Sequence, residues 1–185
     1  MNNPSPTEWY KLGPFTIFDI ETTGMSPVYH RIVELAAVRI DKDGSQTRFN
    51  SLINPGCEIP RKLVSIHGIS NDMVKDASKF KNVGYSFMDF CKGSTLVAHN
   101  ARFDLAFLQE SLARTGLKVW NGKTLDTIPL IKQAYPGLPS YSLQNLRYTF
   151  GLDNEIGPAH RAFADVEWTL KIFKLTMKRL LGAYI

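Results

Sequence analysis

The sequence predicts an α/β protein in which one mixed β-sheet is flanked by helices. Three segments rich in β-branched and aromatic residues come first, and turn residues separate them, which is typical of antiparallel strands. Helical and strand patterns then alternate, which is typical of parallel strands joined through helices. A long amphipathic helix is expected over residues 161–181, with apolar residues recurring at helical spacing from Val166 to Leu180.

The stretch Phe15–Gly24 predicts a buried strand that ends in a turn. Side chains alternate along a strand, so Asp19 and Glu21 share one face with Phe15 and Ile17. A solvated strand end is the simpler explanation of this acid pair taken alone. Two carboxylates at the end of a buried strand repel each other, however, unless a cation joins them.

The other elements follow from the same patterns in chain order. Residues 1–13 are expected to be an N-terminal tail from which Trp9, Tyr10 and Leu12 can dock on a single domain, residues 14–185. Asn100 is expected to cap the helix that follows it. Further strands are expected at 31–40, 46–53, 94–98 and 124–127, and helices after Pro60 and Ser70 and at 82–91, 101–115, 127–134 and 142–150.

The composition fits one domain with a sizeable core, because 44% of the 185 residues are hydrophobic and 21% are charged. A net charge of +5 favours a polyanionic partner, although many basic proteins bind no nucleic acid. Cys57 and Cys91 form no Cys-x-x-Cys pair, which indicates incidental thiols of a reduced, cytoplasmic protein. Residues 1–13 lack the apolar core of a signal peptide, and no apolar run reaches membrane-spanning length, so no membrane partner is expected.

Two further acids each begin an apolar stripe on a helix. Asp104 shares a side of its helix with Phe107 and Leu108, and Asp165 precedes a stripe formed by Trp168, Ile172 and Leu175. An acid in a first helical turn complements the helix dipole, which is the simpler explanation of each. Two such acids beside the strand-end pair indicate convergence on metal. The lysines of the last helix fit a solvated face better than a phosphate contact; they are Lys171, Lys174 and Lys178.

Three stretches, in the expected order, resemble the exonuclease motifs of the DnaQ-like (DEDDh) 3′–5′ exonucleases: residues 18–24, 99–104 and 160–165. The resemblance covers roughly residues 14–181, extends to the epsilon-type proofreading domain of bacterial DNA polymerase III, and implies a ribonuclease H-like fold. The chain has a histidine, His160, five residues before Asp165, and in this it resembles the histidine branch of the superfamily rather than the tyrosine branch. Weaker family signatures are also matched, at residues 66–69, 125–127 and 141–143.

The resemblance implies a role for each matched residue. Four acids would bind metal, and His160, with an ordinary pKa of about 6.5, would be the general base. All-oxygen ligation suits Mg²⁺ or Mn²⁺, and two ions are expected. Phe103 fits the core equally well, His67 fits a loop cap equally well, and Asp126 is more readily structural than a metal ligand. The implied metal ligands are Asp19, Glu21, Asp104 and Asp165, and the implied substrate-binding residues are Thr22, Thr23, Gly24, His67, His99, Asn100 and Phe103.

The implied reaction is hydrolysis of the terminal phosphodiester at a DNA 3′ end, with release of a nucleoside 5′-monophosphate. An RNA-trimming exonuclease of the same superfamily is the first alternative, because the residues that would read a 2′-hydroxyl are not identifiable. A non-catalytic nucleic-acid-binding module and a subunit docked on a DNA polymerase are two others. The chain ends at Ile185 without the extension that bacterial proofreading subunits use to hold their polymerase, which favours a freestanding enzyme.

Overall fold

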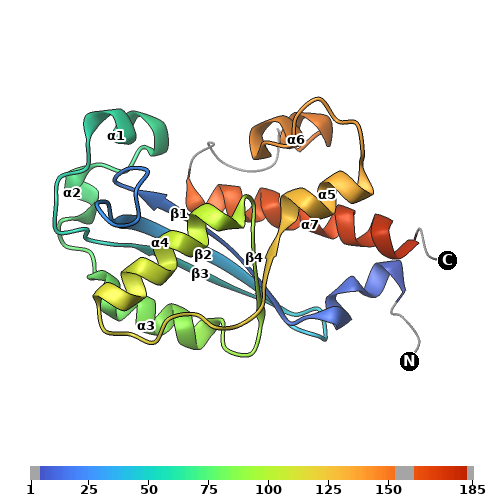
Figure 1. Ribbon diagram of the computed structural model, residues 1–185, viewed down its shortest axis with the longest axis horizontal. Coiled ribbons are helices and arrows are strands. Elements are labelled where there is room, and N and C mark those ends of the chain that lie inside the picture. The colour runs from blue at the N-terminus through green and yellow to red at the C-terminus, as the bar shows by residue number, and fades with distance from the viewer. Residues whose placement is uncertain (1–4, 153–160, 183–185) are drawn as a thin grey trace.

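A computed structural model describes residues 5–152 and 161–182. Five strands form one mixed sheet in the order β3-β2-β1-β4-β5, which confirms the predicted fold class (Figure 1). The pairs β1–β2 and β2–β3 are antiparallel, and the pairs β1–β4 and β4–β5 are parallel. The strands are β1 Phe15–Thr22, β2 Ile32–Ile40, β3 Gln46–Leu52, β4 Thr95–Ala98 and β5 Thr124–Asp126.

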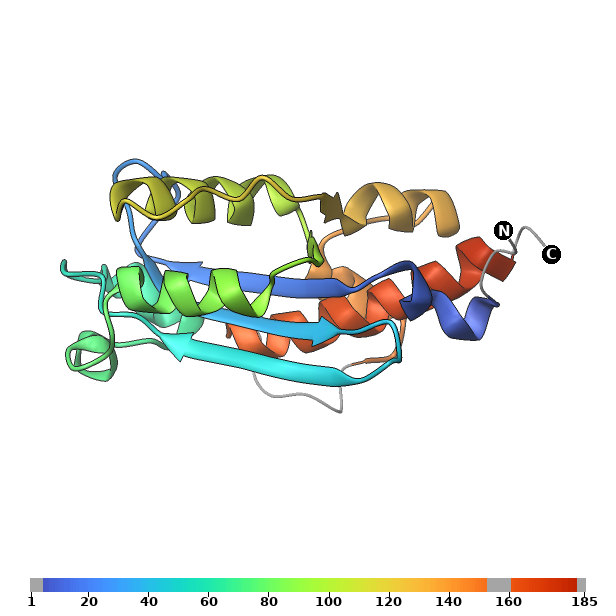
Figure 2. The same cartoon turned by 90° about the horizontal axis from the view of Figure 1, so that it is seen from below.

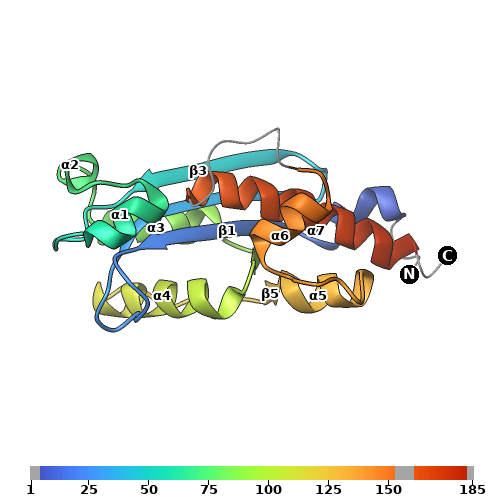
Figure 3. The same cartoon turned by 90° about the horizontal axis from the view of Figure 1, so that it is seen from above.

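Helices cover both faces of the sheet. Figure 2, seen from the side of α3, and Figure 3, seen from the side of α7, show these two helices on opposite sides of the strands. No helix in the described ranges is long and apolar enough to cross a membrane. The helices are η1 Pro6–Leu12 (a 3₁₀-helix), α1 Arg61–His67, α2 Asn71–Val74, α3 Phe80–Phe90, α4 Ala101–Arg114, α5 Thr127–Ala134, α6 Leu143–Thr149 and α7 Ala162–Gly182.

Strand β1 lies at the centre of the sheet, and its alternating side chains supply both cores. Phe18 and Ile20 pack in the core beneath α3 and α4, whereas Phe15 and Ile17 pack in the core beneath α7. Each of these four side chains is at most 5% exposed, and complete burial of such a side chain stabilises a fold by about 1.5–3 kcal/mol. The strand is therefore held firmly from both sides, and the predicted division of its two faces is confirmed.

The segment before β1 is folded on the body from residue 6 onward. Pro6–Leu12 forms η1, and Trp9 is buried with its ring centroid 5.9 Å from that of Phe15 and 5.6 Å from that of Phe173. The expected docking of Trp9 is confirmed, but Leu12 is exposed. Leu175 is also exposed, so the apolar stripe below Asp165 is shorter than the sequence predicts and ends after Ile172.

Candidate active site

The end of β1 places two carboxylates beneath the start of α7. Asp19 lies opposite Ala36 in the β1–β2 ladder, and Glu21 lies opposite Glu34. Both acids follow Ile17 at two-residue intervals, so they point to the face that α7 covers. The strand pattern thus fixes the direction of both side chains.

Helix α7 brings a third acid to the pair. One oxygen atom each from Asp19, Glu21 and Asp165 lies within 4.8 Å of the others. Asp165 is in the first turn of α7, and its backbone N–H donates to the carbonyl of Arg161 at 3.0 Å. The predicted convergence of the strand-end pair with Asp165 is therefore present in the structure.

The fourth predicted ligand, Asp104, lies outside that group of three but close enough to influence it. Asp104 is 3% exposed in the first turn of α4. Its pKa is raised to about 8, mainly by burial and to a lesser extent by the charges of Asp126 and Asp165, while hydrogen bonds at the backbone of Asp104 and Ile20 act in the opposite direction. Asp104 is thus an electrostatic member of the cluster.

The strand acids show the same perturbation for the same reason. Burial raises the pKa of Asp19 well above its ordinary value, and the charges of Asp104, Asp165 and Glu21 add to it. The pKa of Glu21 rises to about 8, mainly through burial and then through Asp165. Carboxyl groups in this state hold either protons or cations. Because every side-chain donor in the cluster is a carboxylate oxygen, the residues fit a hard divalent cation such as Mg²⁺ or Mn²⁺.

An ion pair between the completely buried Glu34 and the partly exposed Arg161 lies directly beside the cluster. Glu34 accepts from Arg161 Nε at 3.1 Å and Nη2 at 2.8 Å, and also from the backbone N–H of Ala162 at 3.1 Å. Sequence analysis did not single out this pair, although a glutamate inside the apolar run of residues 32–38 is a detectable signal. The pair ties the beginning of α7 to the middle of the sheet.

A pocket of about 870 Å³ opens next to Asp19 and Asp165. Three of the predicted substrate-binding residues line it: His99, Asn100 and Phe103. The Phe103 ring is only partly buried and packs 5.0 Å from the ring of Phe107, so it borders both the pocket and the core. Residues that the sequence analysis did not assign to the site complete the walls: Met25, Ile128, Lys132, Tyr141, Ser142, Leu143 and Gln144.

His99 is a neutral connector between three parts of the chain. Its Nε2 lies 2.9 Å from the carbonyl oxygen of Tyr141, so Nε2 donates. Its Nδ1, 2.8 Å from the hydroxyl of Thr127, therefore accepts. Burial lowers the pKa of His99 below its ordinary value, which favours this neutral form. His99 thus joins the end of β4 to α5 and to the segment before α6.

Asn100 does not cap α4, contrary to the sequence prediction. Its backbone is left-handed, with φ of 61°, and its side chain makes no capping hydrogen bond. Asp126 replaces it, since its two oxygens accept from the backbone N–H groups of Asn100 at 3.2 Å and Ala101 at 3.1 Å. Asp126 also accepts from the N–H of Ile128 at 2.9 Å. One carboxylate therefore organises the starts of both α4 and α5.

The turn after β1 is held by its own side chains. The Thr22 hydroxyl donates to the Gly24 carbonyl at 2.6 Å, and the Thr23 hydroxyl accepts from the backbone of Arg31 at 3.0 Å. A Cβ at Gly24 would lie 2.2 Å from the ring of His30. Gly24, one of the implied substrate-binding residues, therefore lies directly against the His30 side chain.

Two predicted histidines remain. His67 does not line the pocket; it is 2% exposed, and its Nδ1 accepts from the N–H of Ile69 at 3.1 Å. This contact fits the loop-cap alternative. His160 lies outside the described residues, next to Arg161 at the start of the last helix.

Comparisons with known proteins agree with this geometry. A profile of the exonuclease family RNase_T matches residues 16–173. The PolC-type DNA polymerase III of Caldanaerobacter subterraneus subsp. tengcongensis is 37% identical over 168 residues, which are 91% of this chain and 12% of that protein. The DNA polymerase III subunit epsilon of Treponema pallidum is 38% identical over 161 residues, which are 86% of this chain and 74% of that protein.

Two solved structures show the fold. Exonuclease X in complex with 5′-overhanging duplex DNA is 29% identical with a TM-score of 0.63, covering 87% of this chain and 90% of that one. Escherichia coli exonuclease I in complex with a dA16 oligonucleotide is 21% identical with a TM-score of 0.79, covering 92% of this chain and 42% of that one. The second likeness supports the ribonuclease H-like fold alone. Since the family profile spans most of the chain, the protein belongs to the RNase_T exonuclease family.

Proposed function

We propose that this protein is a metal-dependent 3′–5′ exonuclease that removes nucleoside 5′-monophosphates from DNA. The observation that carries the proposal is the cluster of Asp19, Glu21 and Asp165 beside a large pocket. The charge of the nearby Asp104 also raises the pKa of Asp19. Family membership indicates that this chemistry is exonucleolytic. The catalytic domain comprises residues 14–185, with the buried Trp9 packing the preceding segment against it.

In this proposal the four acids hold two Mg²⁺ or Mn²⁺ ions. Bound divalent cations would lower the pKa of an attacking water and neutralise charge that develops on the leaving 3′ oxygen. His160, which immediately precedes Arg161 at the start of the last helix, accepts the proton of that water. The acids act as ligands in their ionised form, so cation binding displaces the protons that their raised pKa values favour.

The pocket beside the acids receives the terminal nucleotides. Phe103 and Asn100 lie on its wall, where a partly buried ring and an exposed amide suit a base or sugar. Backbone groups of Thr22, Thr23 and Gly24 grip the terminal nucleotide from the β1 side. His67 and His99 support it indirectly, through the loops that they hold together.

DNA is the proposed substrate because of the proteins that resemble this one. The relatives above are named as DNA polymerase III proteins, and the exonuclease X structure contains duplex DNA. A DNA polymerase is accordingly a proposed partner, to be tested by co-purification with a replicative polymerase. A cytoplasmic location is proposed as well, in line with two free cysteines, Cys57 and Cys91.

The test is a time course on 3′- and 5′-labelled DNA and RNA oligonucleotides with Mg²⁺, Mn²⁺ or EDTA. We expect shortening from the 3′ end of DNA, abolished by EDTA and by Asp19→Asn. Asp72→Asn makes the same chemical change at a side chain that is 92% exposed, and it should retain full activity. Faster hydrolysis of RNA than of DNA would make RNA the substrate in place of DNA. Binding of oligonucleotides without hydrolysis would establish the non-catalytic alternative.

A further inference from the structure

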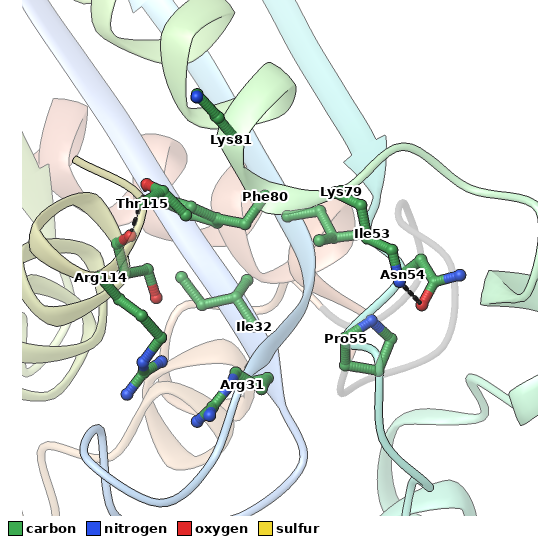
Figure 4. A pocket seen from close by; sticks show the side chains of 11 residues that line it. Arg31, Ile32, Ile53, Asn54, Pro55, Lys79, Phe80, Lys81, Arg114 and Thr115 are labelled. Atoms are coloured by element: carbon green, nitrogen blue, oxygen red, sulfur yellow. Dashed lines mark hydrogen bonds between the residues drawn. The ribbon is translucent and has the colours of Figure 1, made fainter. Parts of the chain in front are cut away.

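A second pocket, of about 180 Å³, lies at the other end of α4 (Figure 4). Its walls include Ile32 from the start of β2, Ile53 after β3 and Phe80 from the start of α3. Helix α4 connects it to the acidic site, because Phe103 lines the acidic pocket and Arg114 lines this one. At 1.5 Å per residue, the 11 residues from Phe103 to Arg114 correspond to about 17 Å along α4.

Four cationic side chains line this small pocket, which has no acidic residue among its lining: Arg31, Lys79, Lys81 and Arg114. Arg114 forms an ion pair with Glu110 outside the pocket, at 3.1 Å. Lys79 and Lys81 are exposed and form no ion pair within residues 5–152 and 161–182. Figure 4 shows the Lys79 ammonium against Asn54, to which it donates at 2.8 Å. The positive charges of Lys79 and Lys81 at this pocket are therefore not compensated by an acid of the described residues.

The two arginines also connect this pocket to the acidic site through residues 24–30. Arg31 Nη1 donates to the His30 carbonyl at 2.9 Å, and Arg114 Nη2 donates to the Val28 carbonyl at 2.8 Å. Met25, at the beginning of the same loop, lines the acidic pocket. A guanidinium has five N–H donors, so both arginines keep further donors for a ligand while the loop fixes their positions.

We propose that these four cations bind backbone phosphates of the nucleic-acid substrate several nucleotides upstream of the 3′ end that is hydrolysed. The inference rests on the proposed function and names a contact that deepens it. Lysine and arginine neutralise phosphates irrespective of sequence, as an exonuclease that moves along its substrate requires. A separation of about 17 Å corresponds to about five nucleotides of a duplex strand at about 3.4 Å each, and to fewer in an extended strand.

The test compares two double variants that each remove two positive charges. Lys79→Gln/Lys81→Gln changes the pocket, and Lys174→Gln/Lys178→Gln changes the face of α7 on the other side of the sheet. Hydrolysis of 4-nucleotide and 15-nucleotide DNA is measured between 50 and 300 mM salt. For the 15-mer, KM should rise on the order of tenfold at 0.1 M salt in the pocket variant, because each phosphate contact contributes a salt slope of about 0.7.

The pocket variant should leave kcat and the hydrolysis of the 4-mer unchanged. For the 15-mer it should reduce the slope of log affinity against log salt concentration by about 1.4. The α7 variant should resemble the wild-type protein with both substrates. Equal KM values for the 15-mer in the wild-type protein and the pocket variant would overturn the inference, as would a larger effect of the α7 variant. Fluorescence anisotropy of the 15-mer in EDTA measures the same contact without hydrolysis, so a failure of the proposed catalysis is distinguishable from a failure of this contact.

Discussion

Replacement of Arg161 by glutamine should destabilise the protein far more than an ordinary surface substitution. Glu34 has no exposed surface, and within residues 5–152 and 161–182 two of its three hydrogen-bond donors belong to Arg161. Breaking a buried ion pair from one side costs about 3–5 kcal/mol, because the remaining charge stays buried. The Arg161 side chain is 34% exposed, so water reaches the pair and the lower end, about 3 kcal/mol, is expected.

The reverse substitution should cost less. In Glu34→Gln the remaining charge belongs to Arg161, which is partly exposed and can turn towards water, and the glutamine oxygen still accepts a hydrogen bond. We expect a loss of about 1–2 kcal/mol. The double variant replaces the ion pair with two neutral amides and should lose about 1–3 kcal/mol less than the sum of the single variants.

Urea unfolding and thermal melts in EDTA measure these differences. A loss of 3 kcal/mol corresponds to a fall in Tm of about 6–12 °C for a protein of this size. Arg48→Gln is the matched control, because it breaks an ion pair to Glu167 in which the arginine side chain is 51% exposed, and it should cost less than about 1 kcal/mol. The reasoning is refuted if Arg161→Gln costs no more than Glu34→Gln, or if the two single losses simply add.

The ion pair should also affect cation binding, because Arg161 precedes Asp165 by one helical turn and accepts a hydrogen bond from its backbone. Loosening the start of α7 should displace Asp165 from Asp19 and Glu21 and weaken Mn²⁺ binding. Isothermal titration with Mn²⁺ checks this directly. A variant that is less stable but binds Mn²⁺ with unchanged affinity would restrict the role of Arg161 to stability.

Three further predictions concern the acids. Asp19→Asn should abolish hydrolysis yet leave the metal-free protein at least as stable as the wild-type protein, because it removes one of several buried carboxyls that repel one another. A urea midpoint below that of the wild-type protein in EDTA would contradict this. The pKa values of Glu21 and Asp104 are each about 8 and exceed their unfolded values of about 4, so the folded state binds more protons than the unfolded state. In EDTA, Tm should therefore fall as the pH rises from 5 to 9, and Mg²⁺ should diminish that fall. Asp126→Ala should cost about 1–3 kcal/mol, since this residue caps two helices; a urea midpoint equal to that of the wild-type protein would contradict this.

Local periodicity predicted the parts of the structure that depend on neighbouring residues. The two-residue period of β1 placed Asp19 and Glu21 on one face, and the helical period placed Asp104 above the buried stripe of Phe107 and Leu108. These predictions succeeded because each side chain's direction follows from its own element. The convergence with Asp165 was inferred from two acids that each begin an apolar stripe, because periodicity alone does not show which elements meet; the family resemblance then assigned the four acids to one metal site.

The errors arose where a residue's partner lies far away in the sequence. Asparagine is a residue type that often caps helices, but the side chain that caps α4 belongs to Asp126, 26 residues after Asn100. No local pattern contains these contacts. Glu34 was overlooked for a related reason, because its apolar surroundings indicate a buried strand without identifying the cation that makes the burial possible.

The acids near the end of β1 differ in whether a cationic side chain neutralises them, and this difference distinguishes a structural acid from the proposed metal ligands. Five acids act on one another near the end of β1: Asp19, Glu21, Glu34, Asp104 and Asp165. Arg161 neutralises Glu34, and its charge also lowers the pKa of Glu21, but burial and the other acids outweigh that effect. The remaining four carboxyls would carry four negative charges when ionised, which two divalent cations would balance. The fold thus satisfies Glu34 with its own guanidinium, whereas the raised pKa values of Asp19, Glu21 and Asp104 favour protons unless cations bind, which is the condition expected of a site that exchanges one for the other.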